Sequence, residues 1–150
     1  MLDEKVSLIS KTTKNFNFKE LLVIILILIF VSSMAQQKIS RKDLLTAAID
    51  SRTVSKVDIK EVIMGVGQTA PYHQHPCPVV GYVAAGTLLF QIEGEPAKTI
   101  KQGEAFFEPA NTPILHFDNA SKTEALKFIA YYLIDKEKKL IEMLPQRQEQ

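Results

Sequence analysis

Cysteine and histidine are scarce in this chain of 150 residues, which contains one cysteine and three histidines. A single cysteine cannot form an internal disulfide, so the stability of the folded part must come from a packed core. At this length the chain is expected to hold one domain. Cys77 is left without a partner and needs an explanation of its own.

Most of the chain has no net formal charge. Residues 36–150 contain 14 Lys and Arg and 14 Asp and Glu, so the slight positive excess lies in residues 1–35. Binding to a nucleic acid normally requires a basic surface that neutralises phosphates. Nucleic acid is therefore not an expected partner.

Only one long apolar run is present, LLVIILILIFV at residues 21–31. It is short for a membrane span, which needs about 20 residues. Lysines precede it, and Ser33 and Ala35 supply small residues at the two positions that a signal peptidase reads. We predict that residues 1–35 are a signal peptide cleaved after Ala35, with an uncleaved N-terminal transmembrane anchor as the alternative. The rest of the protein is expected to be periplasmic or secreted, or anchored and facing outward.

The segments on either side of the predicted domain carry fewer signals. In residues 36–56, Ser40 is followed three positions later by Asp43, a partial capping-box pattern ahead of apolar residues. Both a short helix and an extended arm are compatible with it. The C-terminal residues 136–150 are charged, and this tail is expected to fray or to dock loosely.

Between these segments, residues 57–135 alternate between apolar and polar side chains with a period of two, which is typical of β-strands. Glycines at Glu93-Gly94 and Gln102-Gly103 mark chain reversals. Many short, evenly spaced strands predict an all-β sandwich or barrel. The expected strands are Val57–Val66, Val79–Ala84, Thr87–Ile92, Ala97–Ile100, Ala105–Phe107, Ile114–Phe117 and Ala125–Ile134.

Two of the three histidines, His73 and His75, are separated by one residue. In a strand this spacing projects both imidazoles from the same face, about 7 Å apart at their roots, where two ring nitrogens can converge on one ion. A divalent transition metal accepts imidazole nitrogens at roughly 2.0 to 2.1 Å and needs further ligands from elsewhere in the fold. The alternative is a pair of strand or loop histidines that bind nothing.

The surroundings of the pair resemble the two motifs of the cupin family. Gly67-QTAPY-His73-Q-His75-PCP-Val79-VGYVAA-Gly86 resembles the first motif, and Gly103-EAFFE-Pro109-A-Asn111-TP-Ile114-LHFD-Asn119 resembles the second. The resemblance, to small single-domain cupins, spans roughly residues 57–134. It implies an all-β double-stranded β-helix, or jelly roll, with a metal inside the barrel, and it makes a homodimer expected, for which residues 36–50 are a candidate exchanged arm.

The sequence departs from the family pattern at three positions. The family holds its metal on two histidines and a glutamate from the first motif and a histidine from the second, but Val79 and Ile114 stand where the glutamate and the last histidine are expected. Neither side chain has a donor atom, so only His73 and His75 carry over. Asn111 replaces a glycine, a milder departure because asparagine tolerates a left-handed turn.

Two residues are candidates to complete the metal site. His116 lies two residues beyond Ile114 and is expected to share its strand face, although a histidine at the barrel rim is the alternative. Cys77 could supply a thiolate in place of the missing carboxylate, and its alternative is an inert or oxidised loop cysteine. Glu108, which is not at the position of the missing ligand, is expected to be a surface acid.

Besides a structural or interaction module whose barrel edge pairs with a second copy, two functions remain open from the sequence. One is a metal-dependent exported protein with oxygenase-like or isomerase-like activity on a small molecule, with Fe, Mn, Zn, Cu or Ni as the ion. The other is a metal-free ligand-binding or sensory protein without catalysis. Aromatic residues at strand spacing fit either a cavity wall or an ordinary core; they are Tyr72, Tyr82, Phe90, Phe106, Phe107, Phe128 and Tyr132.

Overall fold

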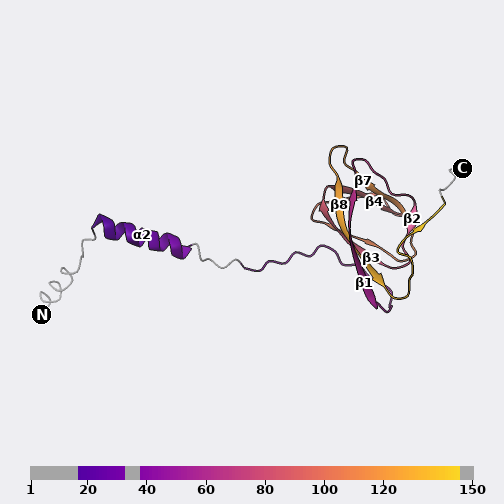
Figure 1. Ribbon diagram of the computed structural model, residues 1–150, viewed down its shortest axis with the longest axis horizontal. Helices are drawn as coiled ribbons and strands as arrows, with labels where there is room; N and C mark the ends of the chain where they lie inside the picture. The colour runs from indigo at the N-terminus through magenta and orange to yellow at the C-terminus, as the bar shows by residue number, and fades with distance from the viewer. Residues whose placement is uncertain (1–16, 33–37, 146–150) are drawn as a thin grey trace, which may run out of the picture. The chain divides into compact units, whose positions relative to one another are not determined.

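The computed structural model describes residues 17–32 and 38–145. The chain divides into two units, Met1–Arg41 and Lys42–Gln150, with one described helix in the first and all described strands in the second (Figure 1). The elements are α2 (Phe18–Ser32), β1 (Lys56–Met64), β2 (His73–Gln74), β3 (Val79–Ala85), β4 (Thr87–Ile92), β5 (Lys98–Lys101), β6 (Ala105–Glu108), β7 (Ile114–Asn119), β8 (Leu126–Ile134) and β9 (Glu142–Met143).

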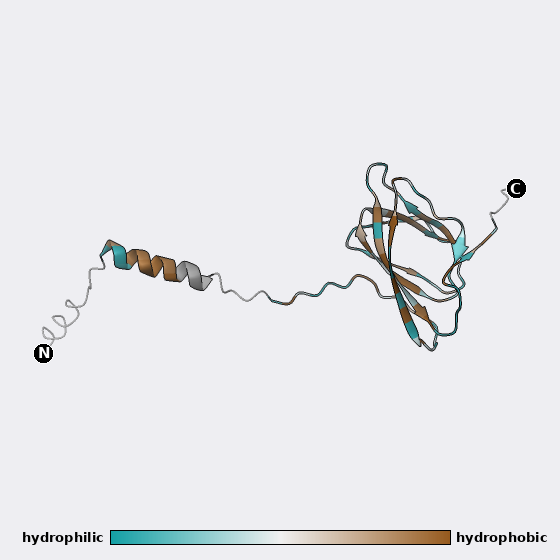
Figure 2. Ribbon diagram, viewed as in Figure 1, coloured by the Kyte–Doolittle hydropathy of each residue, from teal (hydrophilic) through white to brown (hydrophobic). Residues whose placement is uncertain are grey.

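Helix α2 begins with a reciprocal capping box between Asn17 and Glu20. The Glu20 carboxylate accepts a hydrogen bond from the Asn17 N–H (3.1 Å), and Asn17 Oδ1 accepts one from the Glu20 N–H (3.0 Å). The side chains of residues 21–27 are apolar and exposed (Figure 2). Among the described residues, no helix combines the length and the apolarity that a membrane crossing requires. The predicted cleavage site after Ala35 lies outside the described residues.

The second unit contains two antiparallel sheets. One has the strand order β1-β8-β3-β6, and the other has the order β5-β4-β7-β2-β9. Strands that follow one another in the sequence can lie in different sheets. For example, β3 and β4 are separated only by Gly86 yet belong to opposite layers. This is the all-β jelly roll that the sequence predicts.

The core between the sheets follows the period-two pattern. Leu88, Phe90 and Ile92 of β4 all point inward and are buried, because successive side chains of a strand alternate between its faces. Four phenylalanine rings at the centre lie with neighbouring centroids 5.0 to 6.0 Å apart. Burying such a ring stabilises the fold by roughly 2 to 3 kcal/mol. The four are Phe90, Phe106, Phe117 and Phe128.

Two backbone positions need special residues. Gly81 of β3 pairs with Phe106 of β6, and a Cβ at this position would lie 1.9 Å from the Phe106 ring. Asn111 has a φ of 53°, so the left-handed turn expected from the motif is present. The Asn111 N–H donates a hydrogen bond to the carbonyl oxygen of His75 at 2.7 Å, which ties this turn to the histidine segment.

Two short strands, β2 and β9, are absent from the strands predicted by sequence. Strand β9 lies in the tail that was expected to fray or dock loosely, and it pairs with β2 at the edge of the five-stranded sheet. Of the two alternatives, this part of the tail therefore corresponds to docking rather than to fraying. Residues 38–55 contain neither helix nor strand, which corresponds to the arm rather than the short helix.

Candidate metal centre

The two histidines of the His-x-His pair lie inside the barrel. His73 belongs to β2 and pairs with Ile114 of β7 on one side and with Met143 of β9 on the other. His73 is 3% exposed and His75 is 4% exposed, and their ring centroids lie 5.1 Å apart. The expectation that both rings face the interior together is confirmed.

Backbone carbonyls fix the orientation of both rings. The Nδ1 atom of His73 lies 2.7 Å from the carbonyl oxygen of Pro71, and that of His75 lies 2.5 Å from the carbonyl oxygen of Leu140. A carbonyl oxygen only accepts hydrogen bonds, so each Nδ1 carries a proton and donates it. In the neutral rings, the free lone pairs are therefore on the Nε2 atoms, which is the usual arrangement of a metal-binding histidine.

A third donor, the carboxylate of Glu108, meets these two nitrogens. Its Oε2 lies 3.7 Å from His73 Nε2 and 3.2 Å from His75 Nε2. Glu108 is 3% exposed, and Oε2 is buried without a hydrogen-bond partner. The expectation that Glu108 is a surface acid is wrong, because it is the last residue of β6 and points inward like Phe106 two residues earlier.

Glu108 takes the place of the missing carboxylate from the neighbouring strand. Val79, at the usual position of the glutamate, is the direct partner of Glu108 in the β3–β6 register. Directly paired residues of an antiparallel ladder have Cβ atoms about 4.5 to 5.5 Å apart on the same face. A carboxylate moved from one strand to its neighbour therefore reaches the same region of the interior.

The three donor atoms form a group that could bind a metal. One ligand atom of each of His73, His75 and Glu108 lies within 4.8 Å of the other two, and all three residues are buried. Two imidazole nitrogens and one carboxylate oxygen suit zinc, iron, manganese, nickel or copper. The orphaned Glu108 oxygen beside two lone pairs fits a cation, because three acceptors without a proton or ion between them repel one another.

In the metal-free site, the pKa values of His75 and Glu108 are shifted by each other's charge. Burial alone would lower the pKa of His75, but the neighbouring Glu108 carboxylate, helped by the Leu140 carbonyl, leaves that pKa raised. Burial alone would raise the pKa of Glu108, but His73 and His75 leave it lowered. Both shifts favour the charged forms of His75 and Glu108 when no metal is bound, and a metal ion would stabilise the same carboxylate charge.

The family of the domain follows from the sequence match together with this fold. Residues 60–132 match the family model described as Cupin domain. The two-sheet fold agrees with this match, which places a cupin domain at residues 60–132. The match runs from β1 into β8 and includes all three residues of the group.

Known proteins with the cupin fold resemble this chain over part of their length. Dimethylsulfoniopropionate lyase DddQ of Ruegeria pomeroyi is 32% identical over 72 residues, which are 48% of this chain and 33% of the lyase. The crystal structure of that lyase has a TM-score of 0.51 at 23% identity, covering 58% of this chain and 42% of its own. Oxalate decarboxylase from Bacillus subtilis has a TM-score of 0.53 at 14% identity, and the likeness covers 61% of this chain and 24% of the decarboxylase chain. This chain thus spans about a third of the length of the curated relative it matches.

His116 lies apart from the metal-binding group of the cupin domain. The register between β4 and β7 shifts at this point, since Gln91 pairs with His116 but Ile92 pairs with Ile114, skipping one residue of β7. Such a bulge reverses the alternation of side chains, so His116 does not share the face of Ile114. Its Nδ1 lies 2.8 Å from Asp118 Oδ2, and its side chain is 45% exposed.

Cys77 also lies outside the group. It is completely buried in the Pro76-Cys77-Pro78 segment between β2 and β3 and is a free thiol. Burial, and next the charge of Glu137, raise the pKa of the Cys77 thiol, which keeps it protonated at neutral pH. A protonated, fully buried thiol is a poor metal ligand.

A cavity of about 260 Å³ adjoins the three donor atoms. Its walls come from both sheets and from the C-terminal segment, where Ile141 contributes a side chain. Of the aromatic residues considered from the sequence, Phe128 and Tyr132 line it. The lining residues are Val62, Met64, Gln68, Thr69, Ala70, Pro71, His73, His75, Glu108, Phe117, Phe128, Ala130, Tyr132 and Ile141.

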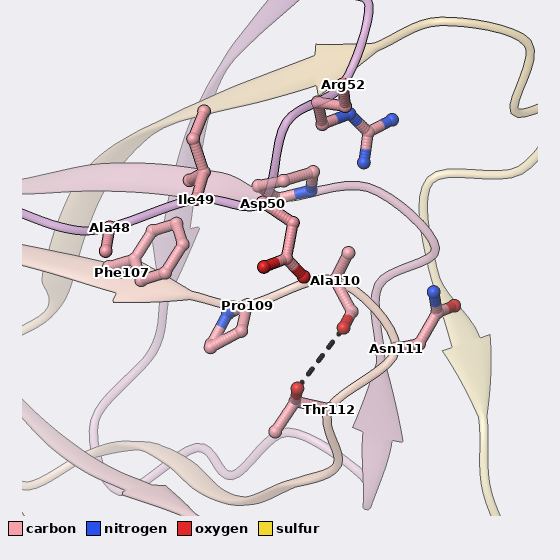
Figure 3. A pocket seen from close by; sticks show the side chains of 10 residues that line it. Ala48, Ile49, Asp50, Arg52, Phe107, Pro109, Ala110, Asn111 and Thr112 are labelled. Atoms are coloured by element: carbon pink, nitrogen blue, oxygen red, sulfur yellow. Dashed lines mark hydrogen bonds between the residues drawn. The ribbon is translucent and has the colours of Figure 1, made fainter.

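A second cavity, of about 350 Å³, lies against the outer face of β6, to which Phe107 points. Figure 3 shows the arm residues Ile49 and Asp50 on one side of it and the loop after Pro109 on the other. Its described lining includes no histidine. The arm therefore covers the loop that leads away from Glu108 without reaching the three donor atoms.

Proposed function

We propose that the cupin barrel of this protein binds a divalent transition metal on His73, His75 and Glu108 and uses it to hold a small organic molecule in the adjoining cavity. The observation that carries the proposal is the buried Glu108 oxygen, which faces two imidazole nitrogens and has no hydrogen-bond partner. A buried carboxylate normally has its charge compensated. A metal ion compensates it and uses both histidine lone pairs.

The ion and the residues around it would contribute differently to binding the small molecule. The bound ion would supply Lewis acidity to an oxygen of the small molecule. The carbonyls of Pro71 and Leu140 hold the imidazoles in the ligating tautomer. Phe117, Phe128 and Ile141 give the cavity an apolar lining beside the donor atoms. Three protein ligands leave coordination positions for a substrate, which favours an oxygenase-like or isomerase-like reaction over a purely structural site.

The decisive experiment is elemental analysis of protein purified without chelators. We expect about one equivalent of a transition metal in the native protein and its loss in the double variant His73→Ala, His75→Ala. The variant His116→Ala serves as the matched control and is expected to retain the metal. Sub-stoichiometric metal that is unaffected by the double substitution would remove the proposal.

A second candidate is a metal-free, non-catalytic binding protein. It is favoured by the hydrocarbon side chains of Val79 and Ile114, both 1% exposed, where the family carries ligands. A thermal-shift screen of small organic acids and sugars in the presence of chelator separates the two candidates. Dimethylsulfoniopropionate belongs in that screen, because it is named in the activity of the lyase relative.

Export of the domain is part of the proposal. The apolar side chains of helix α2 after the lysine-containing segment are typical of the central region of a signal peptide. We propose cleavage after Ala35, with an outward-facing membrane anchor as the alternative. Mass spectrometry of the protein recovered from the expressing cell decides between them, since a mature chain would begin at Gln36.

A homodimer is also proposed. On the outer face of β1, Val57, Ile59 and Ile63 are 48%, 57% and 59% exposed. Contiguous apolar side chains on the outside of a sheet are typical of an interface. Light scattering on the native protein and on the variant Ile59→Lys tests this, because a dimer on this face should dissociate in the variant.

A further inference from the structure

The charges around the cavity restrict what the metal site can hold. Glu108 is the only Asp, Glu, Lys or Arg among the described residues that line the cavity. With a divalent ion on Glu108 and two neutral histidines, the site carries one net positive charge. A ligand with one negative charge neutralises it, whereas a second negative charge would have no cationic partner in this wall.

The rest of the wall is apolar. Phe117 and Phe128 present rings whose centroids lie 5.0 Å apart, and Val62 and Ala130 add aliphatic surface to the wall. The neutral polar groups of the wall outside the metal-binding group come from Gln68, Thr69 and Tyr132. The part of a ligand that lies beyond its anionic end is therefore transferred into a largely hydrocarbon environment.

The size of the cavity limits how much of a ligand its walls can enclose. Its volume of about 260 Å³ equals the space of about nine liquid water molecules, each of which occupies roughly 30 Å³. A ligand with about nine non-hydrogen atoms fills this space. A larger molecule would extend past these walls into solvent.

We infer that the site selects small organic monoanions, with a single carboxylate on the metal and an aromatic or branched aliphatic body against Phe117 and Phe128. This inference rests on the metal site proposed above. The inference goes beyond that metal site by naming the ligand class, and it excludes dicarboxylates of the same size.

Three probes with the same number of non-hydrogen atoms test the inference on the full-length protein loaded with zinc: benzoate, its neutral analogue benzamide, and the branched dianion methylsuccinate. Calorimetric titration should show benzoate binding at least roughly tenfold more tightly than either of the others, because only benzoate neutralises the site. The chelator-treated protein should bind benzoate at least roughly tenfold more weakly than the zinc-loaded protein. Equal binding of all three probes, or equal binding with and without zinc, would overturn the inference.

A pair of variants places the probe in this cavity. Val62 lines the cavity, whereas the next residue, Ile63, is 59% exposed on the opposite face of β1. Val62→Phe should keep its zinc and lose benzoate binding, because the added ring fills the space. Ile63→Phe adds the same ring outside the barrel, and this variant should bind zinc and benzoate as the native protein does. Unchanged benzoate affinity in Val62→Phe would place benzoate elsewhere and overturn the inference.

The failures of the two proposals are distinguishable. A protein that binds no zinc removes the metal site itself. A protein that binds one equivalent of zinc, loses it in His73→Ala, and still shows no preference for benzoate leaves the metal site in place and refutes only the ligand class.

Discussion

The imidazole of His75 donates its Nδ1 proton to the carbonyl oxygen of Leu140, 65 residues away in the sequence and 2.5 Å away in space. The C-terminal segment is therefore part of the site. It also supplies Ile141 to the cavity wall, and the N–H of Leu144 donates to the carbonyl oxygen of Tyr72 at 2.9 Å. A metal bound to His75 would depend on a strand of only two residues, β9, staying in place.

Deleting residues 138–150 should weaken zinc binding by roughly 10- to 100-fold, the usual effect of losing a hydrogen-bond partner of a ligating histidine. The barrel should remain folded, because β9 contributes only two residues to the edge of one sheet. Zinc affinity is measured by competition with a chelating dye, and folding by circular dichroism. Deleting only residues 146–150 leaves β9 intact and is the control. Equal affinities of the two truncated proteins would show that Leu140 does not orient His75.

Replacing the buried carboxylate by an amide separates metal binding from stability. In Glu108→Gln the amide can donate a hydrogen bond to an Nε2 lone pair, so the chelator-treated protein should be at least as stable as the native one. Zinc affinity should nevertheless fall by at least roughly tenfold, because the anionic ligand is lost.

Thermal unfolding with chelator and with zinc measures both effects of Glu108→Gln. Glu124→Gln, at an exposed residue, is the matched control and should change neither. A Glu108→Gln protein that binds zinc as tightly as the native one would mean that the carboxylate is not a ligand.

The fold could be predicted because its signal is local. Alternation in stretches such as Leu88 to Ile92 specifies a strand with one buried face, and glycines such as Gly103 specify turns. Strand β9 could not be predicted, since two residues carry no period and its pairing with β2 is a long-range contact.

The site was only half predictable for the same reason. His73 and His75 lie within three consecutive residues, His73 in β2 and His75 directly after it, so their spacing along the chain predicts that they share a face. Glu108 reaches them only through the register that pairs it with Val79, and no local pattern contains that register. One signal was available, because the alternation of the predicted strand Ala105–Phe107, extended by one residue, puts Glu108 on the inward face of Phe106. The expectation that His116 shares the face of Ile114 is wrong because a single skipped residue in β7 reverses the faces, while the alternative of a histidine at the barrel rim stays open.

The pH dependence should have opposite signs with and without metal. In the metal-free protein the raised pKa of His75 contributes stability that is fully present below 6.5 and is lost as the pH rises through the folded-state pKa. The lowered pKa of Glu108 contributes stability above 4.5 that is lost as the pH falls below this value. The contributions of both groups are therefore present together between pH 4.5 and 6.5.

Zinc binding should instead strengthen as the pH rises through the histidine range, since protons compete with the ion for Nε2. Unfolding midpoints measured from pH 4 to 8, in chelator and in excess zinc, give the two curves. Curves that remain parallel above pH 6.5 would contradict histidine ligation.

Single alanine variants distinguish the three histidines. His73→Ala should weaken zinc binding by more than the roughly 10- to 100-fold expected from losing an outer partner, because it removes a ligand. His116→Ala should leave zinc binding unchanged and cost at most about 1 kcal/mol of stability, since its polar contact is a partly exposed pair with the Asp118 carboxylate. Zinc titration of both proteins provides the comparison. A loss of zinc in His116→Ala would bring this residue back into the site.

The turn at Asn111 should tolerate glycine and reject a branched side chain. Its φ of 53° is reached by asparagine and glycine, while valine in this conformation costs about 1 to 2 kcal/mol. Asn111→Gly should therefore unfold in denaturant within about 0.5 kcal/mol of the native protein, and Asn111→Val should lose the larger amount. Because the Asn111 N–H holds the carbonyl oxygen of His75, Asn111→Val should also weaken zinc binding, whereas Asn111→Gly should not. Equal stability of the two variants would show that the turn relaxes without moving the histidine segment.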